Sequence, residues 1–374
     1  MAIRLLPLLK QKVSQSILFL LESLSPETLR GMIAIVPSDL TVAVVGATGA
    51  VGQEFFRLFE DHAWNIRSLR ALASERSAGK RILFANEQVT VEDSATASFT
   101  GVDVAFFSAG SSTSKALAHK AVAEGAWVID NSSAFRMDST VPLVVPEINL
   151  DAITPSHKLI ANPNCSTIIM LMAVAPLRQF GAIRSVNVST YQSASGAGWA
   201  AMEELRNQTR DVLDGKPAEP QVLPHPYAFN LFSHNTTIGD DGYNEEERKM
   251  ILETHKILGD ATISVSPTCV RVPVLRAHSE SFTVEFADER PSVEAVREAL
   301  AAFPGVKVVD DRATNTFPMP LDASGIEEVL VGRIRHDVGN PKAIQLFACG
   351  DQLLKGAALN AVQIGEGLIA RGLI

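Results

Sequence analysis

The chain is poor in cysteine. Only three occur among its 374 residues, Cys165, Cys269 and Cys349. An odd and sparse set cannot build a disulfide framework, and it fits a reducing compartment such as the cytoplasm. One of the three can therefore be kept for its reactivity.

Patterns for metal, membrane and nucleic-acid binding are also missing. The eight histidines are scattered, with no CxxC and no i, i+4 histidine pair beside a carboxylate, so no metal site is expected. The apolar run from Ile17 to Leu21 stops far short of the roughly 20 residues that span a bilayer, so no membrane span is expected. Because 42 acidic side chains outnumber 33 basic ones, nucleic acid is not an expected partner.

The chain does have enough apolar residues for a sizeable core. Hydrophobic residues make up 46% and charged residues 20%, which excludes intrinsic disorder. At about 150 residues per domain, the length suggests two to three domains. A secretory or transit segment within residues 1–40 is disfavoured, because Glu22 interrupts the apolar run and no small-residue cleavage pattern follows. We expect a surface extension of uncertain role, with a helix ending near Pro26, unless translation starts at Met32.

Two structural regimes follow along the chain. From Thr41 to about residue 167, apolar strand patterns alternate with helical ones, which indicates a parallel sheet covered by helices, a Rossmann-type α/β arrangement. From 168 to 351, strand patterns follow one another with fewer helices, which predicts an α+β domain with an antiparallel sheet. An apolar helix expected at 352–371 should pack back on the first domain. The expected division is therefore a dinucleotide-binding domain at 41–167 with 352–374, and a catalytic and dimerisation domain at 168–351.

The first strand pattern runs directly into a glycine-rich loop. Gly46, Gly49 and Gly52 lie between a strand and a helix, where the chain must turn sharply and let a pyrophosphate approach the backbone. The GxxGxxG spacing is a variant of the usual dinucleotide fingerprint, and its place after a buried strand favours a dinucleotide site. A tight turn that needs glycine for packing alone is the alternative.

The end of the second strand predicts which nicotinamide nucleotide binds. An acidic residue there would hold the ribose 2′-hydroxyl of NAD, and none stands in the expected place. Arg76 and Ser77 instead offer a guanidinium and a hydroxyl suited to a 2′-phosphate, so NADP is favoured. Glu75 opposes this prediction, since turned inward it would bind a ribose hydroxyl.

Cys165 differs from the other two cysteines in its context. It follows Asn164 at the predicted start of an apolar helix, where the helix dipole and free N–H groups stabilise a thiolate nucleophile. Cys269 and Cys349 lie in apolar strand patterns and fit buried structural roles. His278 is the candidate base, although its separation of 113 positions from Cys165 means that only the fold can bring them together.

Six segments together resemble the aspartate-β-semialdehyde dehydrogenase family. They are Gly46 to Gly52, Asn131 to Arg136, Asn162 to Thr167, Tyr191 to Gly198, Arg271 to Val274 with His278, and Leu353 to Ala358. The resemblance covers about Thr41 to the C-terminus and leaves residues 1–40 without a counterpart. It implies a second domain of the glyceraldehyde-3-phosphate dehydrogenase-like kind, and a homodimer or a dimer of dimers (homotetramer).

The resemblance also implies the chemistry. Cys165 would attack L-aspartyl-4-phosphate, releasing phosphate and leaving a thioester that NADPH reduces to the semialdehyde, a step towards lysine, threonine and methionine. His278 would act as the acid/base, and Gln192 would orient the nucleophile or the intermediate.

Substrate and cofactor contacts follow from the same resemblance. Arg271 should clamp the α-carboxylate and Glu246 should meet the α-ammonium, while Arg136 and Lys249 hold the phosphate beside Asn164. Glu246 and Lys249 are also spaced like a solvated surface pair, and Glu245 or Glu247 is an alternative by one residue. The expected cofactor residues are Gly46, Thr48, Gly49, Ala50, Val51, Gly52, Arg76, Ser77, Ser195, Gly196 and Gln352. Gln352 stands where the family pattern has Asn, and a Gln can make the same amide contacts.

Two other functions compete. N-acetyl-γ-glutamyl-phosphate reductase shares the two-domain plan and the cysteine chemistry, but its acylated substrate has no free ammonium for Glu246. A non-catalytic nucleotide-binding relative is disfavoured because both Cys165 and His278 are present.

Overall fold

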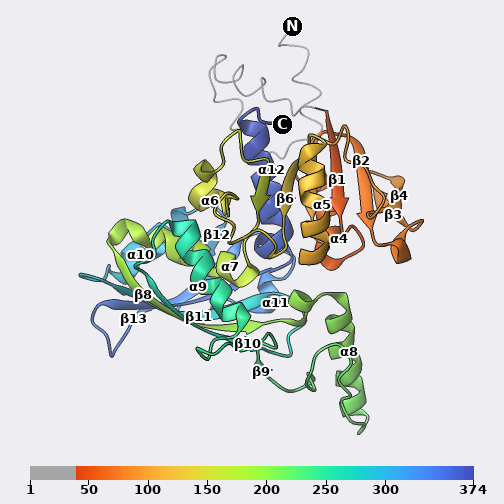
Figure 1. The fold of residues 1–374 in the computed structure, drawn as a ribbon. Coiled ribbons are helices and arrows are strands. Elements are labelled where there is room, and N and C mark those ends of the chain that lie inside the picture. The colour runs from red at the N-terminus through yellow and green to blue at the C-terminus, as the bar shows by residue number, and fades with distance from the viewer. Residues whose placement is uncertain (1–38) are drawn as a thin grey trace, which may run out of the picture. The chain divides into compact units, whose positions relative to one another are not determined.

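The computed structural model describes residues 39–374 (Figure 1). The extension helix expected before Pro26 and the alternative start at Met32 lie outside these residues. Two seven-stranded sheets organise the described part of the chain. In residues 39–374 no helix combines the length and the apolarity needed to cross a membrane.

The first sheet is built around β1, which is buried on both faces, as expected for a central parallel strand. Its spatial order is β3 (Arg81–Phe84), β4 (Glu87–Asp93), β2 (Ile66–Ala73), β1 (Leu40–Val45), β5 (Val104–Phe107), β6 (Trp127–Asp130) and β7 (Leu159–Ala161). All neighbours pair in parallel except β3 and β4. The parallel α/β prediction is confirmed, while the β3–β4 hairpin was not predicted.

Helices cover both faces of this sheet. Alternate residues of β1 enter two different apolar clusters. One cluster contains α5 (Ser111–Ala123), and the other contains α4 (Ala50–Asp61) and the C-terminal helix α12 (Leu359–Ala370). The last helix therefore packs against the first sheet, as predicted, but it is preceded by a separate π-helical turn, Leu354–Ala358.

The second sheet is mixed, not antiparallel as predicted. Its order is β12 (Val306–Val308), β13 (Val329–His336), β14 (Ala343–Gly350), β11 (His278–Phe286), β8 (Ile183–Gln192), β10 (Ser264–Arg271) and β9 (Phe232–Ser233). β10 runs parallel to β8, and β12 parallel to β13. Pro267 does not interrupt β10, because it lies where β10 has a neighbouring strand on one side only.

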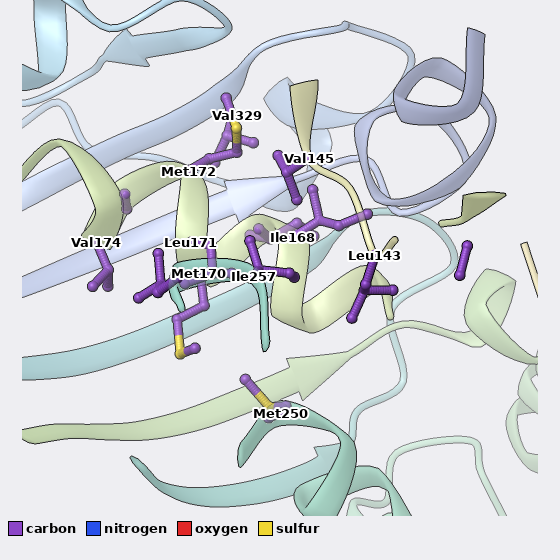
Figure 2. Close-up of a cluster of buried hydrophobic side chains, with 14 of the residues drawn as sticks. Leu143, Val145, Ile168, Met170, Leu171, Met172, Val174, Met250, Ile257 and Val329 are labelled. Carbon is purple, nitrogen blue, oxygen red and sulfur yellow. The ribbon is translucent and has the colours of Figure 1, made fainter. Parts of the chain in front are cut away.

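Helix α7 (Cys165–Val174) positions the reactive cysteine. Every residue after Cys165 in this helix is buried, which is the pattern of a helix packed on all sides. Figure 2 shows Ile168, Met170 and Leu171 near Ile257 of α9 (Glu245–Leu258). The remaining helices are α6 (Pro146–Asn149), α8 (Trp199–Leu213), α10 (Val293–Ala302) and α11 (Pro320–Ala323). The packing of α7 holds its N-terminal end, and so Cys165, at the candidate site.

Candidate active site

A cavity of about 380 Å³ lies beside the N-terminus of α7. It is formed by the loops after β5 and β6 and by the adjoining ends of β8, β10 and β11. The carboxyl ends of parallel strands are where ligands bind in open α/β sheets. Twelve of the predicted site residues line it: Val51, Arg136, Asn164, Cys165, Gln192, Ser195, Gly196, Glu246, Lys249, Arg271, His278 and Gln352.

Cys165 is the first residue of α7. The side chain of Asn164 caps this helix by accepting hydrogen bonds from the N–H groups of Ser166 and Thr167. Burial raises the pKa of the Cys165 thiol to about 12; Glu246 adds to the effect, while Arg136 and Arg271 oppose it. The expected stabilisation of a thiolate by the helix end is therefore outweighed, and the group is a thiol at neutral pH.

His278 begins β11 and is buried. The N–H of Ser193 lies 3.0 Å from its Nδ1, and a backbone N–H can only donate. Burial, with Arg271 adding to it, lowers the pKa of His278 to about 3, so the ring is neutral and carries its proton on Nε2. A Cβ on Gly196 would come 3.0 Å from Nε2, so this position accepts glycine but not a larger side chain without displacement. His278 therefore has an N–H on the ring nitrogen remote from Ser193.

Glu246 is the carboxylate of this cavity. It is only 5% exposed, and its oxygens accept hydrogen bonds from Asn164 Nδ2 at 2.8 Å and Gln192 Nε2 at 3.2 Å. Burial would raise its pKa, but Lys249, whose Nζ lies 3.0 Å away, and the other neighbours hold the pKa well below its usual range. Of the three consecutive glutamates Glu246 alone lines the cavity, whereas Glu247 closes the capping box of α9.

Two arginines add positive charge to that of Lys249. Arg136 donates from Nη1 to Glu253 at 3.1 Å and from Nε to the carbonyl of Asn162. Arg271 donates from Nη1 to the carbonyl of Ser193, while its Nε is buried and has no partner in residues 39–374. An unpartnered buried guanidinium N–H requires an acceptor, and a carboxylate suits it.

The glycine loop is shaped for close backbone approach. Gly46 has φ +93°, and a Cβ there would lie 2.4 Å from the carbonyl oxygen of Ser108. A Cβ on Gly52 would lie 2.2 Å from the carbonyl oxygen of Gly46. Helix α4 begins at Ala50 with no side-chain cap, so its first N–H groups are available to an anion.

The other predicted cofactor residues fall into two groups. Thr48 Oγ1 lies 3.4 Å from Ser77 Oγ, which joins the glycine loop to the turn that contains the exposed Arg76. Gln352 donates to Ser195 Oγ and accepts from the N–H of Ala277, so its longer side chain is held at the cavity. In the described part of the chain, no three His, Cys, Asp or Glu side chains are grouped to hold a metal.

Several residues in or beside the site were given no role from the sequence. Glu253 lies seven residues after Glu246 on α9, so helical periodicity would have found it. Asn131 lines the cavity, and its buried amide nitrogen and oxygen have no partner within residues 39–374. Ser193 lies in the Tyr191–Gly198 segment but was given no role, and its N–H donates to His278. His234 reaches the site through the pairing of β9 with β10, and no local pattern marks it.

Comparison with known proteins places this site in a family. The family model for the NAD-binding domain of semialdehyde dehydrogenases matches residues 41–156, and that for their dimerisation domain matches residues 174–355. An aspartate-semialdehyde dehydrogenase of Synechocystis is 52% identical over 90% of this chain and 99% of its own length.

Solved structures show the same family relationship. The aspartate semialdehyde dehydrogenase II of Vibrio cholerae, crystallised with aspartate semialdehyde (ASA), has a TM-score of 0.86 at 42% identity, covering 89% of this chain and 98% of its own. The Candida albicans enzyme with NADP has a TM-score of 0.72 at 25% identity, covering 90% of this chain and 100% of its own. The chain thus combines a nucleotide-binding domain with a dimerisation domain, and it belongs to the aspartate-semialdehyde dehydrogenase family.

Proposed function

We propose that this chain reduces L-aspartyl-4-phosphate to L-aspartate 4-semialdehyde and phosphate, using NADPH and a thioester on Cys165. The observation that carries the proposal is the joint lining of one cavity by a cysteine, a neutral histidine, a buried carboxylate and three cations. A free amino acid with a phosphorylated side chain matches these charges.

Each charged group of the substrate has a protein partner in the cavity. The unpartnered Nε of Arg271 suits the α-carboxylate, and the ionised Glu246 suits the α-ammonium. Arg136 and Lys249 provide positive charge for the phosphate, and the free amide of Asn131 adds a hydrogen-bond donor. The buried Glu246 disfavours N-acetyl-γ-glutamyl-phosphate, whose acylated nitrogen would leave that charge unpaired.

The chain's residues then account for each proton. As the sulfur of Cys165 bonds to the acyl carbon, the acyl–oxygen bond breaks and the thiol proton leaves with the phosphate. NADPH, when bound, supplies the hydride that reduces the thioester. The Nε2–H of His278 stabilises the developing oxyanion; as the adduct collapses to the aldehyde and the carbon–sulfur bond breaks, His278 passes its proton to the sulfur of Cys165 and takes a replacement from solvent. Gln192, held by Ser166 and Glu246, orients the reacting group.

NADP is the proposed nucleotide. The tight turn that Gly46 and Gly52 allow brings the uncapped start of α4 to the end of β1, and its first N–H groups fit a pyrophosphate. Arg76 is exposed beside Ser77 at the end of β2, where a 2′-phosphate would lie. The Candida albicans relative solved with NADP supports this choice.

A homodimer, or a dimer of dimers, is the proposed assembly, in the cytoplasm. The face of the second sheet turned away from α7 carries half-exposed or exposed side chains, among them Asn187, Tyr191 and Thr283. A second copy of the dimerisation domain would cover such a face. The domain division expected above, 41–167 with 352–374 and 168–351, is part of the proposal.

One assay tests the function. Purified protein is mixed with NADP, inorganic phosphate and aspartate semialdehyde, and absorbance of the reduced nicotinamide is followed. We expect a steady-state rate that requires phosphate, that is lost in Cys165→Ser, and that N-acetylglutamate semialdehyde does not give. Phosphate-independent turnover, or a silent wild-type chain, would refute the proposal.

A further inference from the structure

His234 lies beside Arg271 in the lining of the active-site cavity. It follows β9, whose Phe232 and Ser233 pair with Arg271 and Val270 of β10. Its own N–H donates to the carbonyl of Cys269 at 2.8 Å. The histidine backbone is therefore held against the strand that carries Arg271.

The side-chain hydrogen bond between these residues has only one direction. Arg271 Nη2 lies 2.8 Å from His234 Nε2, and a guanidinium can only donate. Nε2 is therefore the acceptor, and the neutral ring carries its proton on Nδ1. Burial lowers the pKa of His234 to about 4, so the ring stays an acceptor at neutral pH.

Thr236 connects this histidine to the other substrate-binding group. Its Oγ1 lies 3.2 Å from His234 Nδ1, where it receives the ring proton. The same oxygen accepts the N–H of Glu246 at 3.2 Å, in the first turn of α9. A hydroxyl oxygen has two lone pairs, so it can accept both hydrogen bonds. A continuous chain of hydrogen bonds thus runs from Arg271 through His234 and Thr236 to Glu246.

Arg271 has two protein acceptors, one on each terminal nitrogen. Nη1 donates to the carbonyl of Ser193 and Nη2 to His234, while Nε is left without a partner. The two acceptors fix the plane of the guanidinium, and with it the direction of the Nε–H bond. Removing the His234 acceptor would free the plane to rotate.

We propose that His234 is a positioning residue that orients Arg271 and, through Thr236, sets its separation from Glu246, so that the pair recognises the α-carboxylate and α-ammonium of one amino-acid substrate. The inference rests on the proposed function. It extends that function because the specificity for an α-amino acid then depends on His234 as well as on Arg271 and Glu246, which would bind the substrate directly.

The test compares His234→Ala with His234→Gln, whose amide oxygen can accept from Arg271. Steady-state kinetics are measured with aspartate semialdehyde, NADP and phosphate. We expect His234→Ala to raise KM for the semialdehyde about tenfold, the loss of one charge-assisted hydrogen bond, with kcat and the KM for NADP changed less than about twofold. His234→Gln should recover most of the loss. His336→Ala, an exposed histidine at the end of β13, is the matched control and should change nothing.

A second substrate separates positioning from general damage. 3-Aminopropanal lacks the α-carboxylate, so His234→Ala should lower kcat/KM for it far less than for aspartate semialdehyde. If the alanine variant does not fold, Thr236→Val is measured instead, with a KM increase expected in the same substrate-selective way.

Three results would overturn the role of His234 or the proposed function. An unchanged KM in His234→Ala, or an equal loss with both aldehydes, overturns the role of His234 while the active wild type preserves the proposed function. Failure of His234→Gln to recover activity, with a lowered melting temperature, also overturns it. A silent wild-type chain overturns the proposed function, and this inference with it.

Discussion

Gly356 lies directly against the nucleophile: a Cβ placed on it would come within 2.9 Å of the Cβ of Cys165. Gly356 belongs to the π-helical turn before α12, so the C-terminal segment defines one wall of the reacting centre. Irregular helical turns of this kind are frequent at functional sites.

Gly356→Ala should therefore displace Cys165. A shift of about 1 Å at a reacting group can cost about 100-fold in rate, so we expect kcat to fall by about that factor. Gly339→Ala is the control, because a Cβ there makes only an ordinary contact at 3.4 Å. Equal kcat values for Gly356→Ala and wild type would show that the close contact is relieved without moving the sulfur.

The high pKa of Cys165 predicts its reactivity with pH. Below a pKa of about 12, the thiolate fraction rises tenfold with each unit by which the pH increases. Alkylation of the free protein by iodoacetamide, followed at Cys165 by peptide mass spectrometry, should accelerate from pH 7 to pH 10 without a plateau. A plateau near neutral pH would mean that the helix end and the arginines outweigh burial.

Glu253 should stabilise the fold as well as the site. It is 1% exposed, pairs with Arg136 at 3.1 Å and accepts the N–H of Asn164 at 2.6 Å. Glu253→Ala leaves a buried cation unpaired, so the free energy of unfolding should fall by about 3 kcal/mol in urea titrations. Glu253→Gln, which keeps an acceptor for Asn164, should lose less. Equal stability of the alanine variant and wild type would contradict this account.

Arg76 should determine the preference for NADP. Replacing it by Ala removes the exposed guanidinium at the end of β2. We expect kcat/KM for NADP to fall about tenfold, the value of one charge-assisted contact, with little change for NAD. Lys80→Ala, in the same exposed loop, is the control. An unchanged NADP to NAD ratio in Arg76→Ala would rule out this assignment.

His62 should make stability depend on pH. Its hydrogen bond to Glu366, opposed in part by burial and assisted by Glu327, raises its pKa to about 9 from 6.5. A raised folded-state pKa stabilises the fold fully below pH 6.5, and this contribution is lost as pH rises through about 9. The difference in unfolding free energy between wild type and His62→Gln should shrink over that range. A difference that does not change with pH would refute this role of His62.

The sequence predicted the parts of the fold that local patterns encode. The alternation around β1, the glycine loop and the helix start at Cys165 depend on neighbours in the chain, and the structure has them. The prediction that all strands of the second sheet are antiparallel was wrong, because the parallel β8–β10 pairing joins residues about 80 positions apart. The raised pKa of Cys165 was not predicted for a similar reason: the helix end is a local feature, whereas burial is imposed by the whole fold. His234 enters the site only through such pairing.

The central claim is a thioester on Cys165, and a single-turnover experiment tests it most directly. The protein is mixed with aspartate semialdehyde and NADP without phosphate, and NADPH absorbance and the mass of the Cys165 peptide are recorded together. We expect a burst of NADPH of about one equivalent per site, an aspartyl adduct on Cys165, and release of that adduct when phosphate is added. A burst with no adduct on Cys165, or with an adduct on another residue, would contradict the account.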